Sequence, residues 1–493
     1  MERNVHMPLS RRHVIAGLTS SLIATACQGR DGSTASRETA RPMAKDRPAR
    51  TLSSLGVDRF STRDQWRLLD QACRAAHEGG FDLLGDPDAY YRHDGPLSLQ
   101  GVSFDGRGCT LGALSDARQV LRCIGSNFRI ANLRLLGAAR ARTSDDWDDG
   151  LWIGDESHEA SDFVVEDVTV DAVAPGRGVA AAGFMFNNAH RGRIVRPVVR
   201  HSFADGIHVT NGSSDLVFER PLSENTGDDG FAVVSYVRQR QVCRNIRATD
   251  GISRNSAARG FTVVGGTDVV YERPVIERSA AAGLYLYGEE SFNTFGVARC
   301  RVTAPVIRGC VTGRGLPAGF DQGAITIGGR AGQDRVGDTM VARAAVDCTI
   351  VDPVIDAVGQ ACRAAVMLHE FAVRPHITGA RLSNVTSTNP GLHPNGFDIG
   401  GRDVTIDRPR LTDIDGLPFV LTRTASGTAT INAPIVNGSR LRGGPVDSVI
   451  YAENAPGLTR FTVNGGRFAR GSANLSISLL PANKLRLVDN LVR

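Results

Sequence analysis

The chain has 493 residues, of which 41% are hydrophobic and 22% are charged. This balance predicts a folded protein and excludes a disordered chain, and the length suits either several ordinary domains or one large repetitive domain. The net charge of +5 is small for this length, so the composition gives no reason to expect a nucleic-acid partner.

The chain begins with the pattern of an export signal. Arg11 and Arg12 precede a short apolar run that ends at Cys27 and cannot span a membrane. The pattern over residues 1–27 resembles a twin-arginine (Tat) signal, which implies a periplasmic, cell-envelope or extracellular protein. The segment Ala24–Cys27 resembles a lipoprotein cleavage site, which implies lipidation of Cys27 as the protein's membrane anchor. Ordinary cleavage nearby is the alternative.

Residues 28–52 are rich in Arg, Ser, Ala and Pro, a composition that predicts a flexible tether. Residues 53–493 then form one domain, which opens with a short helix. Trp66, Leu69, Cys73 and Ala76 mark one face of that helix, and Thr62–Gln65 reads as a capping box. We expect this amphipathic helix to cover the exposed first coil of a repetitive fold.

From Asp149 onward two short phrases repeat. The first is Gly-apolar-x-apolar, found as GLWI, GFMF, GIHV, GFAV, GFTV, GLYL and GFDI; the second is a strand that runs into proline, as in LVFERPL and VVYERPVI. The glycine phrases mostly recur every 23 to 33 residues. Each alternates apolar residues with a period of two, and no helical pattern of useful length separates them.

Short strands repeated without crossover helices stack as coils of a solenoid. The sequence therefore predicts an all-β fold, a right-handed parallel β-helix of about 10–12 coils. The order of a helix, Gly79-Gly80, a tyrosine-bearing turn and the phrases LSL and VSFDG resembles the opening of the pectate-lyase-like superfamily. The resemblance covers most of residues 55–480 and implies this fold rather than one particular activity.

One corner of these coils is acidic. Asp205 precedes Gly206, Asp228 and Asp229 precede Gly230, and Arg259 precedes Gly260. The residue between the apolar pair of each phrase points outward, so we expect His208, Ala232, Thr262 and Tyr285 to form an external column beside this corner. Carboxylates stacked this closely repel one another, which raises the pKa of at least one.

Here the chain also resembles the polygalacturonase-type glycoside hydrolases, whose motifs are Asn-Thr-Asp-Gly, Gly-Asp-Asp and Gly-His-Gly on successive coils. The matching phrases are FADG, GDDG and ARG. The resemblance implies that Asp229 or Asp228 is the general acid, that the other two of Asp205, Asp228 and Asp229 position and activate water, and that no cofactor is needed. Arg259 replaces the family histidine and, with His208, would assist.

Two other functions fit the same residues. A polysaccharide lyase would hold Ca²⁺ on Asp205, Asp228 and Asp229 and use Arg259 as base, although arginine is a poor base at its usual pKa. A non-catalytic carbohydrate-binding or surface-structural module would use each Asp-Gly only as a corner, because aspartate accepts backbone hydrogen bonds there.

The substrate of either enzyme is a polysaccharide or oligosaccharide. Residues near the acidic corner would bind it through aromatic faces and polar groups. The candidates are Asp149, Trp152, Tyr285, Tyr287 and Glu289, and residues 145–148 extend the same acidic-aromatic patch.

Overall fold

The computed structural model describes residues 47–115, 120–143, 149–316, 321–356, 359, 362–387, 389, 391–437, 448–469 and 474–492. The predicted export signal, with Cys27, and residues 145–148 of the acidic-aromatic patch lie outside this set.

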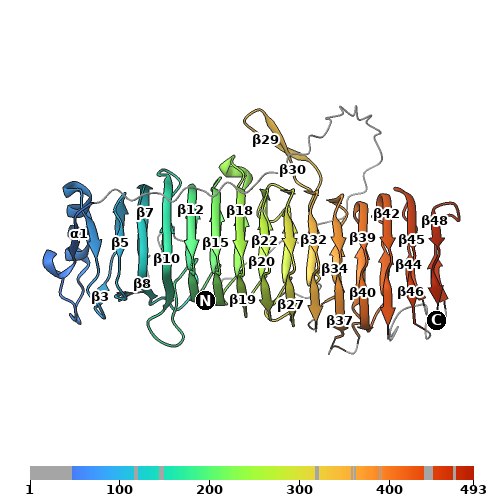
Figure 1. The fold of residues 1–493 in the computed structure, drawn as a ribbon, viewed down its shortest axis with the longest axis horizontal. Coiled ribbons are helices and arrows are strands. Elements are labelled where there is room, and N and C mark those ends of the chain that lie inside the picture. Colours follow the sequence, from blue (N-terminus) through green and yellow to red (C-terminus); the bar gives the residue numbers. More distant parts are fainter. Residues whose placement is uncertain are drawn as a thin grey trace, which may run out of the picture. The chain divides into compact units, whose positions relative to one another are not determined.

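The domain is a right-handed parallel β-helix (Figure 1), as predicted. One coil illustrates the construction: β14 (Ile207–Thr210), β15 (Ser214–Glu219) and β16 (Leu222–Thr226) follow one another around the axis. The chain then returns as β17 (Phe231–Val234), which pairs in parallel with β14 through Ile207 opposite Phe231. Apolar residues alternate along each strand, so every coil turns one set of side chains into the common core.

The glycine phrases form one continuous face. Within the described residues this face stacks fourteen strands: β4 (Ser98–Gln100), β7 (Leu121–Ser126), β9 (Leu151–Ile153), β11 (Phe184–Asn187), β14, β17, β20 (Phe261–Val264), β24 (Leu284–Tyr287), β28 (Ile325–Gly328), β34 (Ala364–Leu368), β38 (Asn395–Ile399), β41 (Phe419–Leu421), β44 (Ser448–Ala452) and β47 (Asn474–Ser478). The count exceeds the predicted 10–12 coils, because the first two and last three of these strands lack the glycine phrase and carry no signal at that period.

The core contains stacked side chains from successive coils. The rings of Phe231 and Phe261 lie 5.3 Å apart and almost parallel, and both are buried. All eight cysteines of the described region are buried and free of disulfides. Cys243, Cys300 and Cys348 therefore serve as small apolar core residues, as their strand-opening positions indicate.

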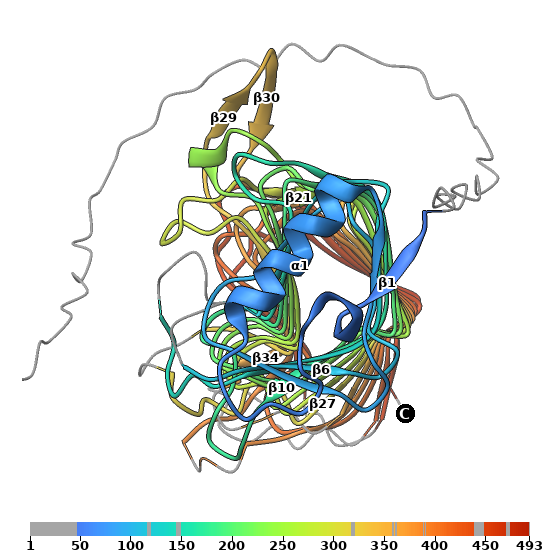
Figure 2. The ribbon, with the colours of Figure 1, turned by 90° about the vertical axis from the view of Figure 1, so that its left-hand side faces the viewer.

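The predicted end cap is present as α1 (Trp66–Gly79), which buries Leu69, Ala72, Cys73 and Ala76. Figure 2 shows it lying across the end of the coils. The prediction of a capping box at Thr62 was wrong, because Gln65 is the N-cap residue. The Gln65 side chain accepts the backbone N–H of Asp58 and donates to the Asp58 carbonyl.

The ordered coils also begin earlier than the sequence indicated. β1 (Ala49–Thr51) pairs in parallel with β2 (Asp82–Leu84), and Leu52 is buried. These residues were assigned to the tether because their composition is polar, but the pairing with β2 incorporates them into the first coil.

One element departs from the stack. The strands β29 (Gln333–Val336) and β30 (Thr339–Ala342) form an antiparallel hairpin that projects from the coils (Figures 1 and 2). In the described part of the chain, no helix has the length and apolar character needed to cross a membrane.

Candidate active site

The acidic corner arises from the glycine of each repeated phrase. A Cβ on Gly206 would lie 2.4 Å from Ser223 Oγ and 2.5 Å from the carbonyl oxygen of Gly230, so only glycine lets the chain turn this close to its neighbours. Gly206 N–H donates to the carbonyl of Asp229, and Gly230 N–H donates to that of Arg259. Asp205, Asp229 and Arg259 therefore stack on successive coils, as predicted.

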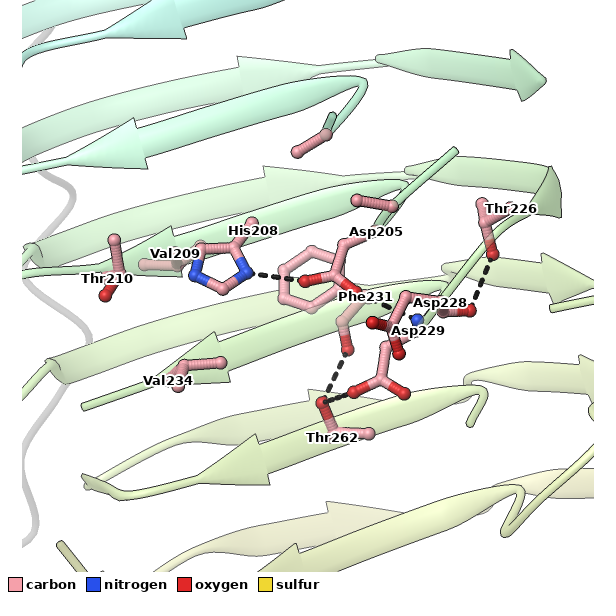
Figure 3. Close-up of polar contacts among 12 residues, drawn as sticks. Asp205, His208, Val209, Thr210, Thr226, Asp228, Asp229, Phe231, Val234 and Thr262 are labelled. Carbon is pink, nitrogen blue, oxygen red and sulfur yellow. Dashed lines mark hydrogen bonds and ion pairs between the residues drawn. The ribbon is translucent and has the colours of Figure 1, made fainter. Parts of the chain in front are cut away.

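The three carboxylates converge at this corner (Figure 3), with oxygens of Asp205, Asp228 and Asp229 all within 4.8 Å of one another. Asp205 Oδ1 accepts the backbone N–H of Asp229 at 2.9 Å, and Asp229 Oδ1 accepts that of Arg259 at 2.9 Å. Both aspartates thus support the next coil, as expected if each Asp-Gly serves as a corner of the fold. Asp228 differs, because its Oδ2 accepts from the Arg142 guanidinium at 2.7 Å.

Crowding and burial raise the pKa of two of these acids. Asp229 is only 4% exposed, and its burial raises its pKa to about 7, against the opposing pull of Arg259 and with added repulsion from Asp228 and Asp205. Burial likewise raises the pKa of Asp228, with repulsion from Asp205, while Arg142 opposes the shift. The corner therefore holds a proton near neutral pH, which a general acid requires.

His208 is part of this network. Its Nδ1 lies 2.5 Å from Asp205 Oδ2, and its ring stacks on Tyr236 with centroids 6.5 Å apart. Burial alone would lower the pKa of His208, but the hydrogen bond and charge of Asp205 outweigh it and raise that pKa. The imidazole therefore orients the Asp205 carboxylate.

Arg259 is held as a permanent cation. Its guanidinium lies 3.5 Å from Asp229 Oδ2, pairs with Glu289 and sits over the Tyr285 ring at 4.2 Å from the centroid. Burial opposes the charged form, but the Asp229 carboxylate outweighs it and raises the pKa of Arg259. A guanidinium in this setting cannot accept a proton, so the arrangement disfavours the lyase in which Arg259 is the base.

Carboxylates are the ligands that Ca²⁺ prefers, yet this cluster fits the ion poorly. Its oxygens already accept hydrogen bonds from His208, from Arg142 and from the backbone of the adjoining coils. A divalent ion would have to displace these donors and lie beside two guanidinium groups. The cluster therefore does not suit a reaction assisted by Ca²⁺.

The cluster lies in a groove of about 750 Å³. All five predicted catalytic residues line it: Asp205, His208, Asp228, Asp229 and Arg259. Of the predicted substrate-binding residues, Asp149, Trp152 and Glu289 line it as well, although each is at least 94% buried. Asp149 also caps the next coil, because its Oδ1 accepts the Ala182 N–H at 2.7 Å.

Tyr285 and Tyr287 are not among the groove-lining residues. Their rings stack on each other at 5.0 Å, and Tyr285 packs under Arg259. The predicted external column exists in register, with His208, Ala232, Thr262 and Tyr285 in successive strands. The column is not external, however: Ala232 and Thr262 are fully buried, and Ala232 and Tyr285 pack with Val234 and Val264 in a second apolar cluster.

Several groove residues were not anticipated from the sequence. They come from loops outside the repeated phrases, and they include Arg142, Glu156, Tyr236, Arg238 and Phe292. A repeat pattern marks only the strands and their corners. Nothing in the spacing of these loop residues indicates that they return to the same groove.

These features define a right-handed parallel β-helix with an acidic groove. A family model described as the catalytic domain D2 of α-1,3-glucanase matches residues 162–296. The matched segment contains the three clustered aspartates together with His208 and Arg259. A search of curated proteins gave no match.

Solved structures with a similar architecture come from several kinds of protein. The Dettilon tailspike protein is 11% identical, with 89% of this chain and 68% of that chain covered and a TM-score of 0.48. A GH87 α-1,3-glucanase catalytic domain in complex with nigerose is 16% identical, with 83% and 68% covered and a TM-score of 0.47. The A-module of the Azotobacter vinelandii mannuronan C-5 epimerase AlgE4 is 14% identical, with 90% and 97% covered and a TM-score of 0.39.

Proposed function

We propose that the protein is a glycoside hydrolase that cleaves a polysaccharide in this groove, with α-1,3-glucan as the first candidate substrate. The observation that carries the proposal is the convergence of Asp205, Asp228 and Asp229 within 4.8 Å. The cluster lies inside the segment that matches the α-1,3-glucanase catalytic domain. Paired carboxylates with separated protonation states are the usual machinery of glycosidic hydrolysis.

Asp228 suits the role of general acid. Its side chain is 33% exposed, against 6% for Asp229, so it can reach a glycosidic oxygen in the groove. Burial raises its pKa, a shift in the direction that a general acid needs. Asp205, oriented by His208, and Asp229, held by Arg259 and Thr262, then position and activate the attacking water.

The charge of the groove favours a neutral sugar over a uronate. Its lining includes six acidic residues, namely Asp149, Glu156, Asp205, Asp228, Asp229 and Glu289, and three arginines, Arg142, Arg238 and Arg259. Arg142 and Arg259 are already paired with lining carboxylates. A substrate carboxylate would therefore meet net negative charge, with only Arg238, stacked over the Tyr236 ring, left to receive it, which argues against galacturonan.

We also propose that the enzyme acts outside the cytoplasm, on the basis of the twin-arginine pattern at Arg11 and Arg12. Lipidation at Cys27 would attach it to the cell envelope. Mass measurement of the exported protein tests both statements, because cleavage and acylation change the mass by characteristic amounts.

The function is tested by offering the protein α-1,3-glucan, other neutral glucans and galacturonan, with and without a chelator. We expect new reducing ends from a neutral glucan, no absorbance of an unsaturated uronide, no effect of the chelator, and loss of activity in Asp229→Asn. Unsaturated products that disappear with the chelator would establish the lyase instead. If none of these polymers is cleaved, the hypothesis that the aspartates serve only as corners of the coils is favoured.

A further inference from the structure

The loop between β24 and β25 (Val297–Ala298) carries two phenylalanines in opposite environments. Phe295 is completely buried, whereas Phe292 is 61% exposed and lines the groove. Exposing a large aromatic ring forgoes the free energy of its burial. Since the same loop already has an apolar anchor in Phe295, Phe292 contributes little to packing.

The loop holds Phe292 in a fixed position. Glu289 N–H donates to Thr294 Oγ1 at 2.8 Å, and Asn293 N–H donates to the Glu290 carbonyl at 3.0 Å. From outside the loop, Arg330 donates to Asn293 Oδ1 at 2.7 Å. These bonds close a turn around residue 292, so the ring is presented to the groove by an ordered backbone.

The same loop is connected to the acids. Glu289 lies three residues before Phe292 and pairs with Arg259, which in turn pairs with Asp229 at 3.5 Å. A second contact joins the loop to the segment that carries Tyr236 and Arg238, because Val237 N–H donates to the Asn293 carbonyl at 3.0 Å. The position of the aromatic ring is thereby coupled to that of the carboxylate cluster.

We propose that Phe292 is a stacking platform for one pyranose ring of the bound glucan, in the same groove as Asp228. The apolar C–H face of a neutral sugar packs well on an aromatic face, and such a residue adds affinity without entering the chemistry. The inference rests on the proposed hydrolase function and adds to it a residue that binds substrate.

The test compares Phe292→Ala with Phe60→Ala in the full chain. Phe60 is 64% exposed and does not line the groove, so it reports the effect of removing an exposed phenylalanine. We expect Phe292→Ala to raise KM for α-1,3-glucan about tenfold with a smaller change in kcat, and Phe292→Trp to restore KM. Phe60→Ala should have the KM and kcat of the wild type. All three variants should have the thermal midpoint of the wild type.

Binding is measured separately, by calorimetry with an α-1,3-linked glucotetraose on the Asp228→Asn variant. Adding Phe292→Ala should weaken that Kd about tenfold. If the wild type cleaves glucan but Phe292→Ala behaves as Phe60→Ala in KM and Kd, the platform is refuted and the hydrolase stands. If the wild type cleaves no polysaccharide and Asp228→Asn binds no tetrasaccharide, the proposed function fails and the platform with it.

Discussion

Aspartates on neighbouring coils of this protein form two very different structures. At the acidic corner, three carboxylates converge. Along two other edges, aspartates pair with arginines on the next coil, and these exposed pairs are together called the ladder. They are Asp162–Arg191, Asp268–Arg299 and Asp347–Arg374 on one edge, and Asp167–Arg196 and Asp250–Arg273 on the other. All ten residues of the ladder have left-handed backbone conformations.

The two structures shift the pKa of aspartate in opposite directions. In the ladder, the hydrogen bond from the partner arginine lowers the pKa of the aspartate. This holds for Asp162, Asp167 and Asp250. At the corner, burial raises the pKa of Asp228 and Asp229. The next coil supplies an arginine to Asp229 as it does to Asp162. The opposite shifts in pKa therefore follow from the burial of the corner and its neighbouring carboxylates.

The largest expected effect separates the two structures by activity. Asp228→Asn removes the proposed acid, and we expect kcat on glucan to fall at least about 10³-fold, within the range of general acid catalysis. Asp162→Asn is the matched control, since it makes the same change in the ladder, and its activity should equal that of the wild type. Initial rates of reducing-end release measure both. Equal activities for the two variants would refute the assignment of Asp228.

The second effect concerns stability. Arg259→Ala leaves Asp229 and Glu289 as buried, unpaired carboxylates, so we expect the free energy of unfolding to fall by about 3 kcal/mol. Arg191→Ala removes an exposed ladder arginine and should cost less than about 1 kcal/mol. Urea unfolding at pH 8 compares them. Similar midpoints for the two variants would mean that Arg259 is not compensating buried charge.

The third effect is a change of stability with pH that has opposite signs at the corner and in the ladder. The pKa of Asp229 is about 7 in the folded chain, above the ordinary value of 3.8. Its ionisation therefore removes stability as pH rises from about 4 through 7. Asp229→Asn cannot ionise, so its thermal midpoint relative to wild type should rise between pH 5 and pH 8.

In the ladder, ionisation of an aspartate changes stability in the opposite direction. The lowered pKa of Asp162 means that its ionised form adds stability above about pH 4, so Asp162→Asn should lower the midpoint at pH 8 and lose that effect in acid. If both asparagine variants responded to pH in the same direction, the contrast between corner and ladder would be wrong.

The sequence predicted the fold and the acidic corner because both depend on the repeat. The phrases GIHV and GFAV fix a strand register, and that register stacks Asp205 on Asp229. Their period also identifies the outward positions, including His208. Features that follow from the repeat can therefore be predicted from the sequence alone.

The rest of the site depends on loops that the repeat does not specify. Arg142 reaches Asp228 across 86 residues of sequence, and the exposed Phe292 is distinguished from the buried Phe295 only by the turn between them. Tyr285 occupies a position that the strand pattern marks as outward, but it is buried in a small apolar cluster with Val234 and Val264. Packing between side chains from distant positions sets these contacts, and short-range sequence patterns do not encode it.

The smallest effect tests whether His208 acts through Asp205 or merely fills space. His208→Ala removes the 2.5 Å contact to Asp205 Oδ2, and we expect kcat to fall about tenfold while KM changes little, because a positioning contact is worth one hydrogen bond to a charged group. His201→Ala is the control: His201 also contacts an aspartate, Asp171 at 2.9 Å, but outside the groove. His208→Asn, which retains a donor, should recover part of the rate. A rate for His208→Ala equal to that of His201→Ala would show that Asp205 needs no orienting partner, and the acidic corner would then operate through its three carboxylates and Arg259 alone.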